Sequence, residues 1–421
     1  MKKLICLCSL FLLCFTAQLG LAAEGKNFFL EWPRMEQAVA YEVEIVDGAR
    51  LLAAKKGVSV VPLWQNNRIY TLGCNVELPV DYTGKSIFWH VRGLNQARLP
   101  MSAYTTWRKV VIDRSLPVER KPLSLEKYKT GNGSSLLYPV YDWIPLQGVR
   151  NYEVEILTAP PENPNGTAPS QYRLEVKKTT GFDLYDDAPK LSTLTLYWRV
   201  LGVDDKGQAQ GVYSDAAAFN ANPDKNFQVG VLGDSISHGG GSISYPPTNL
   251  DYSYLHYLNF DAVNLSNSGD TSAATLSRFD QDVLPFHVKY LLIMTGSNSL
   301  RGWIEADSVI SDLTALKTKC LENNIKPVFL TLPPINPANI KRAFNEPTAE
   351  DWQERFAAVN AYINTQVHID VTAGLADAQG NLPTVLALDG IHLDPPGKKM
   401  IAAAINAAWP GILQLPDSAW Q

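Results

Sequence analysis

Apolar and polar residues alternate with a period of two in the first half of the chain, and the pattern occurs twice. Residues 41–45 read Tyr-Glu-Val-Glu-Ile, which puts Tyr, Val and Ile on one face of a strand and both glutamates on the other. The same five residues return at 152–156. Each copy has a later aromatic strand, at 88–93 in the first and 197–202 in the second. We therefore expect an internal repeat built from half-buried strands.

These short strands are separated by clusters of Gly, Pro, Asn and Asp, as in β-sandwich domains. The pattern of Trp, Tyr-x-Val and aromatic-x-Val strands resembles fibronectin type III modules. We predict two all-β sandwich domains, at 26–113 and 137–221, joined by a linker at 114–136 that is rich in Pro, Lys, Ser and Gly. Their aromatic residues could bind sugar rings, but alternating aromatics favour a packed core, so the expected role is that of a spacer.

From residue 227 the pattern changes to continuous apolar runs that alternate with segments of helical periodicity. The apolar runs lie at 227–232, 262–265, 290–294, 327–330 and 367–371. The helical segments lie at 307–323, 350–366 and 397–409. Alternation of this kind predicts a parallel sheet with helices on both faces. We expect a three-layer α/β/α, flavodoxin-like domain with a parallel five-stranded sheet over residues 227–415.

Polar residues follow the predicted strands at the ends where open α/β sheets bind their ligands. Gly233-Asp234-Ser235 follows the first strand, and Asp389-x-x-His392 lies before the last helix. Gly269 follows the second strand and Asn298 the third. Each segment alone is typical of a turn or a helix cap. Together, at successive strand ends, they indicate one shared site.

The chemistry of this site can be argued from residue types. A serine hydroxyl is a weak nucleophile at neutral pH and needs an adjacent base. We predict Ser235 as the nucleophile and His392 as the base, because histidine changes its protonation near neutral pH. Asp389 can accept the other imidazole N–H and hold the ring in one tautomer. The rival bases are His238, His256, His287 and His368. Of these, His238 lies closest to Ser235 in the sequence and is, together with Arg301, a possible substrate-binding residue.

The segments at these strand ends resemble those of the SGNH (GDSL-type) hydrolases. The matching blocks are Gly233-Asp234-Ser235, Gly269, Gly296-x-Asn298 and Asp389-x-x-His392. The resemblance implies an oxyanion hole formed by the backbone amides of Ser235 and Gly269 and by the side-chain amide of Asn298. The family commonly has Asp after the third-block Asn. Ser299 stands there instead, which we expect to loosen the support of this loop.

The first residues read as an export signal. Lys2 and Lys3 precede an apolar run at 4–21, and residues 20–22 end in a small-x-small cleavage pattern. The alternative, a membrane anchor, is disfavoured because the run is short and turns polar at 16–18. No cysteine here follows a small residue as a lipidation site would require. We predict a signal peptide at 1–22 and a secreted or periplasmic protein without membrane insertion after cleavage.

Composition narrows the classes of partner. The chain has 421 residues, 46% apolar and 19% charged, which favours two or three folded domains. Its net charge of −5 comes with no basic stripe, and this argues against nucleic acid as a partner. After signal cleavage Cys74 and Cys320 remain, in different predicted domains, so we expect isolated thiols, no metal site and no cofactor.

The expected function is hydrolysis of short acyl esters, acetyl esters first, on carbohydrate or polysaccharide through an acyl-enzyme on Ser235. An acylated carbohydrate or another small ester is the expected partner, and the oligomeric state stays open. One alternative is a non-catalytic glycan-binding or adhesive protein on a hydrolase scaffold. A lipase or thioesterase of the same family is another, although no long apolar lid segment occurs in the sequence.

Overall fold

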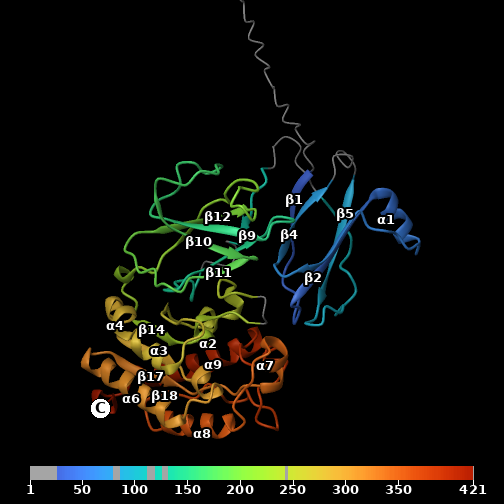
Figure 1. The fold of residues 1–421 in the computed structure, drawn as a ribbon. Coiled ribbons are helices and arrows are strands. Elements are labelled where there is room, and N and C mark those ends of the chain that lie inside the picture. Colours follow the sequence, from blue (N-terminus) through green and yellow to red (C-terminus); the bar gives the residue numbers. More distant parts are fainter. Residues whose placement is uncertain (1–25, 79–85, 111–118, 126–130, 242–244, 421) are drawn as a thin grey trace, which may run out of the picture.

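The computed structural model describes residues 26–78, 86–110, 119–125, 131–241 and 245–420. The predicted signal peptide at 1–22 and parts of the predicted linker, 114–118 and 126–130, lie outside these ranges. The chain forms two β domains and one α/β domain (Figure 1). The second β domain, in green, lies directly against the α/β domain, in yellow to red, while the first, in blue, lies beside both.

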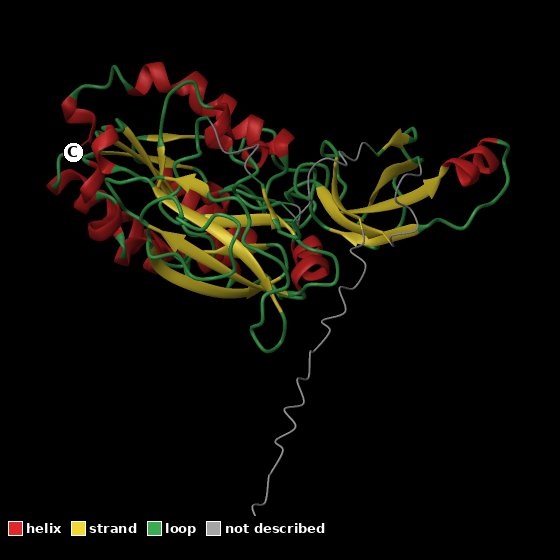
Figure 2. Cartoon of the chain, turned by 90° about the horizontal axis from the view of Figure 1, so that it is seen from above, coloured by secondary structure: helices red, strands yellow, loops and turns green. Residues whose placement is uncertain are grey.

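The first β domain has two antiparallel sheets. One pairs β1 (Lys26–Glu31) with β4 (Gly73–Leu78). The other has the order β3-β2-β5-β6, with bounds Trp64–Ile69, Ala40–Asp47, Ile87–Leu94 and Arg108–Lys109. Trp32 packs between Tyr41 and Trp89 in the core, with ring centroids 5.4 and 6.1 Å apart. A helix that the pattern did not predict, α1 (Gly48–Lys55), follows β2 and lies far from the C-terminus (Figure 2).

The second β domain repeats this plan. One sheet has the order β10-β9-β12-β13, with bounds Arg173–Thr180, Asn151–Leu157, Leu196–Val203 and Ala217–Phe219. The other has the order β11-β8-β7, with bounds Asp183–Tyr185, Val140–Ile144 and Leu123–Ser124. Because β7 lies within the predicted linker, the described part of that segment is not a plain connection. The likeness of either domain to fibronectin type III modules stays a prediction.

One polar pair departs from the expected strand faces. Glu44 opposes His90 across β2 and β5, and Glu155 opposes Arg199 at the equivalent place across β9 and β12. The expectation that the glutamates face solvent is wrong for Glu155, which is fully buried, as is Arg199. The residues 158–172 cover them, and the Arg199 guanidinium donates to the carbonyl oxygens of Asn163 and Ala168.

The α/β domain contains the predicted parallel sheet. Its order is β15-β14-β16-β17-β18, with bounds Val263–Asn264, Val229–Gly233, Tyr290–Met294, Lys326–Leu330 and His368–Ile369. In chain order this is 2-1-3-4-5, the flavodoxin-like arrangement. All residues of β14 and β16 are buried, as continuous apolar strands require. The predicted fold class is therefore confirmed.

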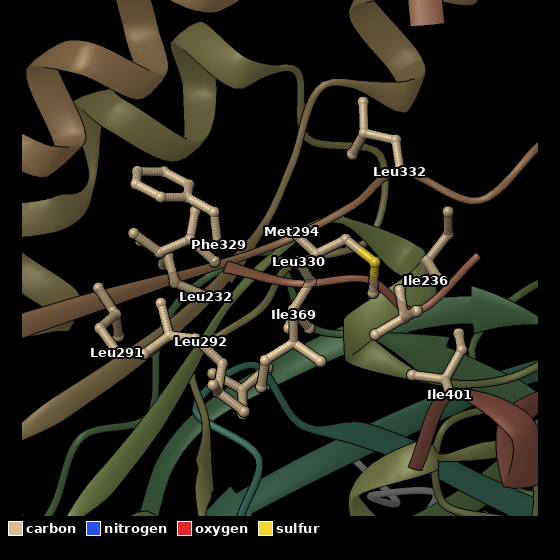
Figure 3. Packing of buried hydrophobic residues seen from close by; sticks show 14 of the residues in the cluster. Leu232, Ile236, Leu291, Leu292, Met294, Phe329, Leu330, Leu332, Ile369 and Ile401 are labelled. Atoms are coloured by element: carbon tan, nitrogen blue, oxygen red, sulfur yellow. The ribbon is translucent and has the colours of Figure 1, made fainter. Parts of the chain in front are cut away.

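Helices cover both faces of the sheet. On one face α3 (Ser272–Ser277), α6 (Ala306–Glu322) and α8 (Trp352–Ile363) pack side by side. On the other α9 (Pro395–Ile412) packs against the 3₁₀ turns Leu250–Tyr252 and Tyr254–Tyr257. The remaining helices are α2 (Ser235–His238), α4 (Phe279–Asp282), α5 (Ser297–Arg301) and α7 (Pro337–Phe344). Leu232, Leu292 and Ile401 of the core lie between the layers (Figure 3).

A short piece of the predicted linker extends the parallel sheet. The backbone N–H of Asn264 in β15 donates to the carbonyl of Ser135 over 3.0 Å, and that of Leu137 donates back to Asn264 over 2.9 Å. Residues 135–137 therefore lie on the edge of the α/β sheet just before the chain enters β8. This pairing joins the start of the second β domain to the α/β domain.

Cys74 and Cys320 are both buried free thiols in different domains. Among the helices of the described ranges, none has the length and apolar character needed to cross a bilayer.

Candidate active site

Ser235 lies at the turn from β14 into α2. The strand ends at Gly233, where any side chain would collide with the carbonyl oxygen of Met294 on β16. Asp234 caps α2, and its Oδ1 accepts the N–H of Ile236 over 3.0 Å. Burial raises the pKa of Asp234 to about 6, against the effect of that hydrogen bond. The tight turn presents Ser235 at the carboxyl end of the sheet.

His392 connects Ser235 with Asp389. The distance from Ser235 Oγ to His392 Nε2 is 2.8 Å, and that from His392 Nδ1 to Asp389 Oδ2 is 2.9 Å. Asp389 is fully buried, and its Oδ1 accepts the backbone N–H groups of Ile391 and His392. Burial alone would raise the pKa of Asp389, but His392 and these N–H groups outweigh it and lower the pKa. Asp389 is therefore an ionised acceptor at neutral pH, and the three predicted residues lie in one chain of contacts.

The Asp389–His392 loop depends on a glycine. Gly390 has φ +89°, and a Cβ there would lie 2.5 Å from the carbonyl oxygen of Asn336. A residue with a side chain would thus be strained by its backbone and would clash with α7. Gly390 lets Asp389 turn back toward His392 within three residues.

Gly269 and Asn298 lie beside the nucleophile in one cavity of about 310 Å³, together with Ser235 and His392. Gly269 has φ +89° and leaves open space where a side chain would stand. The Asn298 Nδ2 donates to the carbonyl of Asp270 over 3.0 Å, which uses one of its two N–H groups. Arg301 donates to Asn298 Oδ1 over 3.0 Å and so fixes which way the amide points.

Arg301 was predicted as a possible substrate-binding residue. In the structure its side chain contacts both Glu346 and Asn298. It lines the cavity, and its Nη1 lies 2.7 Å from Oε2 of Glu346, which also lines it. Its bond to Asn298 makes it a positioning residue for the predicted oxyanion hole as well.

Ser299 ties its own loop to the segment after Gly269, so the expected loosening of this loop is not seen. Its Oγ accepts the backbone N–H of Ser272 over 2.9 Å and lies 3.1 Å from the Ser272 hydroxyl. Ser272 in turn donates to Asp312 on α6 over 2.6 Å. The carboxylate of Asp312 is thus connected to the Asn298 loop through the hydroxyls of Ser272 and Ser299.

His238 does not line the cavity. It is buried, with Nδ1 2.8 Å from Ser268 Oγ and Nε2 2.8 Å from the carbonyl oxygen of Tyr138. Because a carbonyl only accepts, Nε2 carries the proton and Nδ1 accepts from the Ser268 hydroxyl. Burial lowers the pKa of His238 to about 4, so the ring stays neutral. The prediction that it touches substrate is replaced by a role in holding Ser268, which does line the cavity.

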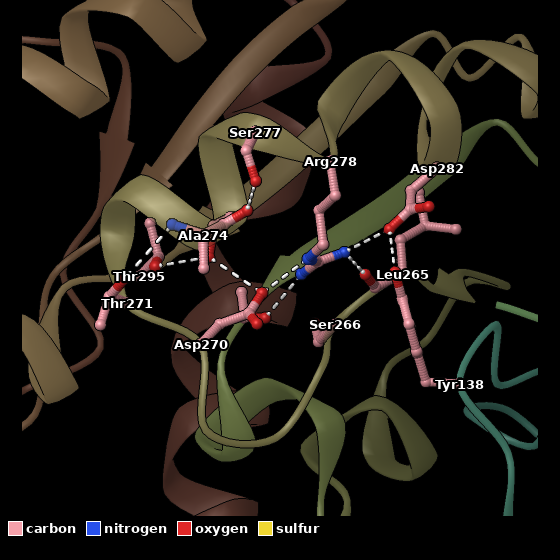
Figure 4. A network of polar contacts seen from close by, with 12 residues as sticks. Tyr138, Leu265, Ser266, Asp270, Thr271, Ala274, Ser277, Arg278, Asp282 and Thr295 are labelled. Atoms are coloured by element: carbon pink, nitrogen blue, oxygen red, sulfur yellow. Dashed lines mark hydrogen bonds and ion pairs between the residues drawn. The ribbon is translucent and has the colours of Figure 1, made fainter. Parts of the chain in front are cut away.

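No sequence motif points to Arg278, which lies at the centre of a network of polar contacts with Asp270 and Asp282 (Figure 4). Its guanidinium lies 2.6 Å from Asp270 and 2.8 Å from Asp282, and it donates to the carbonyls of Gly233 and Leu265. It therefore joins the end of β14 to the loop that carries Gly269. A buried Arg between two Asp residues leaves no signal in the sequence, because only the fold brings Asp270 and Gly233 to one side chain.

Lys398 on α9 was also missed. It is fully buried, and its Nζ donates to the carbonyl oxygen of Ile236 over 2.7 Å, directly behind the nucleophile. Burial lowers its pKa to about 8, although Asp234 and Asp389 act in the opposite direction. Lys398 fixes α9 against the helix that carries Ser235.

Several cavity residues come from outside the predicted motifs. Phe344, at the end of α7, meets the ring of His392 edge-on at 6.0 Å. Tyr245 lines the cavity, and its hydroxyl lies 2.6 Å from that of Tyr41 in the first β domain. Tyr185 reaches the cavity from the second β domain. In the part of the chain that the structure describes, His, Cys, Asp and Glu form no cluster suited to a metal ion.

Residues 231–400 match the model of the GDSL-like lipase/acylhydrolase family, a range that includes Ser235, Asn298, Asp389 and His392. This part of the chain is therefore a GDSL-like lipase/acylhydrolase domain, and acylhydrolases of this family are carboxylic ester hydrolases. The comparison with curated proteins found no match.

Two solved structures are each similar to less than half of this chain. A GDSL-like lipase from Bacteroides thetaiotaomicron is 21% identical, with a TM-score of 0.34, over 45% of this chain and 90% of its own. A catalytic mutant of an acetylxylan esterase from Geobacillus stearothermophilus is 16% identical, with a TM-score of 0.33, over 42% of this chain and 92% of its own.

Proposed function

We propose that the protein is an exported serine esterase that removes short acyl groups, acetyl in the first instance, from carbohydrate. The observation that carries the ester chemistry is the chain of contacts from Ser235 through His392 to the buried Asp389. The acylhydrolase domain is shown by the family match, whereas the short acyl group, the carbohydrate and the export are what we propose.

The geometry supports a two-step reaction. Ser235 Oγ attacks the ester carbonyl while His392 Nε2 takes the hydroxyl proton, and Asp389 stabilises the resulting imidazolium. The carbonyl oxygen gains negative charge and is held by the N–H groups of Ser235 and Gly269 and the Asn298 amide. The C–O bond then breaks, the alcohol leaves with the proton from His392, and the acyl group stays on Ser235. Water, deprotonated by His392, releases the carboxylic acid and restores the serine.

The cavity supports a small, polar substrate. Its volume of about 310 Å³ lies at the low end of ligand sites, which span about 300–1,000 Å³. Arg301, Glu346, Asn298 and Ser268 supply groups that can bind hydroxyls. A long acyl chain would need a more extended apolar lining.

Acetate release tests this proposal. Wild-type protein and the Ser235→Ala variant are offered acetylated xylo-oligosaccharides, acetylated pectin, a palmitoyl ester and an acyl thioester. We expect release of acetate from one of the glycans and a loss of about 10⁴-fold or more in Ser235→Ala. Asn298→Ala should lose about 10²–10³-fold, as one oxyanion donor does.

Other outcomes would contradict the proposal in distinct ways. Preference for the palmitoyl ester or the thioester would indicate a lipase or thioesterase. Binding of glycan without turnover of any ester would indicate the non-catalytic alternative. Export is tested by producing the full chain in a Gram-negative bacterium and sequencing the periplasmic product, which we expect to begin at Ala23.

A further inference from the structure

Tyr185 brings the second β domain into the hydrolase cavity. It is the last residue of β11, and it lines the same cavity as Ser235 and His392. All other residues that line the cavity, within the described ranges, come from the α/β domain at 235–392. In Figure 1, β11 is drawn on the side of its domain that faces α2. A ligand bound in this cavity can therefore contact a side chain of the second β domain.

The position of Tyr185 is held by its neighbours. Its backbone pairs with Val140 in β8, and the next residue, Asp186, donates its N–H to the carbonyl of Pro139 over 2.9 Å. The ring meets His238 edge-on, with centroids 6.3 Å apart at 74°. His238 is itself fixed from both nitrogens. The ring is thus pre-organised and loses little conformational freedom when a ligand binds.

Despite this support, Tyr185 remains 43% exposed, so part of its surface is open toward solvent and the cavity. An aromatic ring of this kind offers a flat apolar face with a polar tip. The cavity also has the ion pair of Arg301 and Glu346, whose groups can bind hydroxyls. One apolar face and several hydroxyl-binding groups match a pyranose ring, which has a C–H face and a rim of hydroxyls.

We propose that Tyr185 is a specificity-determining residue that stacks on the sugar ring of the ester's alcohol part. The second β domain then supplies a sugar subsite and is not a spacer. This inference rests on the proposed function, because it identifies where the carbohydrate of that substrate lies.

The test compares two esters and two tyrosines. Acetate release is measured on acetylated xylo-oligosaccharides and on ethyl acetate, which has no sugar ring to stack. The matched control is Tyr172→Ala, a comparably exposed tyrosine of the same β domain that does not line the cavity. For Tyr185→Ala we expect the ratio of kcat/KM on the oligosaccharide to that on ethyl acetate to fall about 3- to 10-fold, mainly through KM.

Further variants separate the ring from its bulk. Tyr185→Phe keeps the aromatic face and should retain most of the ratio, whereas Tyr185→Leu keeps apolar volume without that face and should lose it. Equal ratios in Tyr185→Leu, Tyr172→Ala and wild type would overturn the sugar subsite while leaving the esterase function intact. Absence of acetate release from every glycan by the wild type, with ethyl acetate still hydrolysed, would instead overturn the carbohydrate substrate itself.

Discussion

The two β domains have nearly the same strand pattern but differ in what covers their polar faces. In the first, Glu44 pairs with His90 at 3.0 Å, and the imidazole stacks on Tyr104 and Trp107. In the second, the equivalent Glu155 and Arg199 are sealed beneath residues 158–172. A sequence pattern with a period of two assigns side chains to the two faces of a strand, but it does not say which face is exposed to solvent.

The domains also differ in how they meet the hydrolase. The first touches it through side chains, such as Tyr41 on Tyr245 and Gln96 on Arg342. The second is joined to it by backbone hydrogen bonds between residues 135–137 and β15. Its residue Tyr185 also lines the hydrolase cavity. Two copies of one repeat can therefore make different contacts with the same neighbouring domain. Three sets of substitutions test this contrast.

The largest expected effect is at the buried pair. Arg199→Met leaves the Glu155 carboxylate buried with Arg173 as its remaining cation, and we expect a loss of about 3–5 kcal/mol in the stability of the second β domain. His90→Met, its counterpart in the first domain, should cost less, because Glu44 is partly exposed and can be hydrated once the imidazole is gone. Calorimetry of the unfolding transitions measures both. The double variant Glu155→Met/Arg199→Met should regain most of the loss, and equal costs at the two sites would refute the contrast.

The next effect depends on pH. Because burial lowers the pKa of His238 to about 4 from an unfolded value near 6.5, the unfolded chain binds more protons between these values. Stability from this group is present above pH 6.5 and is lost as pH falls toward 4, up to about 3 kcal/mol. His238→Gln can keep both hydrogen bonds and should remove this loss.

The readout is the difference between the wild-type and His238→Gln unfolding curves across that range. The raised pKa of Asp234 acts in the opposite direction and is present in both proteins, so it cancels. His90→Gln serves as a control at a second buried histidine, in the first β domain, where Glu44 opposes the effect of burial on the pKa of His90. A pH dependence unchanged by His238→Gln would show that the histidine is not held neutral.

The smallest effect concerns single hydroxyls at the two contacts. Tyr138 donates to Asp282 over 2.7 Å and belongs to the segment that enters β8. Tyr138→Phe should cost about 1 kcal/mol, since Arg278 still pairs with Asp282. Tyr41→Phe, which removes the contact with Tyr245, should cost a similar amount. Chemical denaturation at neutral pH measures both, and a Tyr138→Phe cost several times larger would show that this hydroxyl holds the Arg278 network together.

Much of the fold followed from local pattern. The five apolar runs of the α/β domain became its five strands, because a continuous apolar run can be buried on both faces only inside a sheet. Helix α1 and the strand β7 were missed, since both are short and lie in segments without clear periodicity. The predicted bounds of the linker, 114–136, therefore include residues that belong to β7 and to the edge of the α/β sheet.

The site divides in the same way. Ser235, Asp389 and His392 could be named because each lies on a strand-end motif with its own turn chemistry. His238 was the rival candidate, three residues from Ser235, yet its Nε2 lies against the carbonyl oxygen of Tyr138. Only the packing of the second β domain against α2 decides that.

The amino-acid sequence by itself determined the parallel sheet, the nucleophile turn and the Asp389–His392 loop, because these depend on neighbours within a few residues. The tertiary structure alone decided that Arg278 holds the Gly269 loop and that Tyr185 enters the cavity. Arg278 reaches back 45 residues to the carbonyl of Gly233, and Tyr185 belongs to a different domain from the rest of the cavity lining. Such contacts depend on burial and on the packing of distant segments, which no local pattern records.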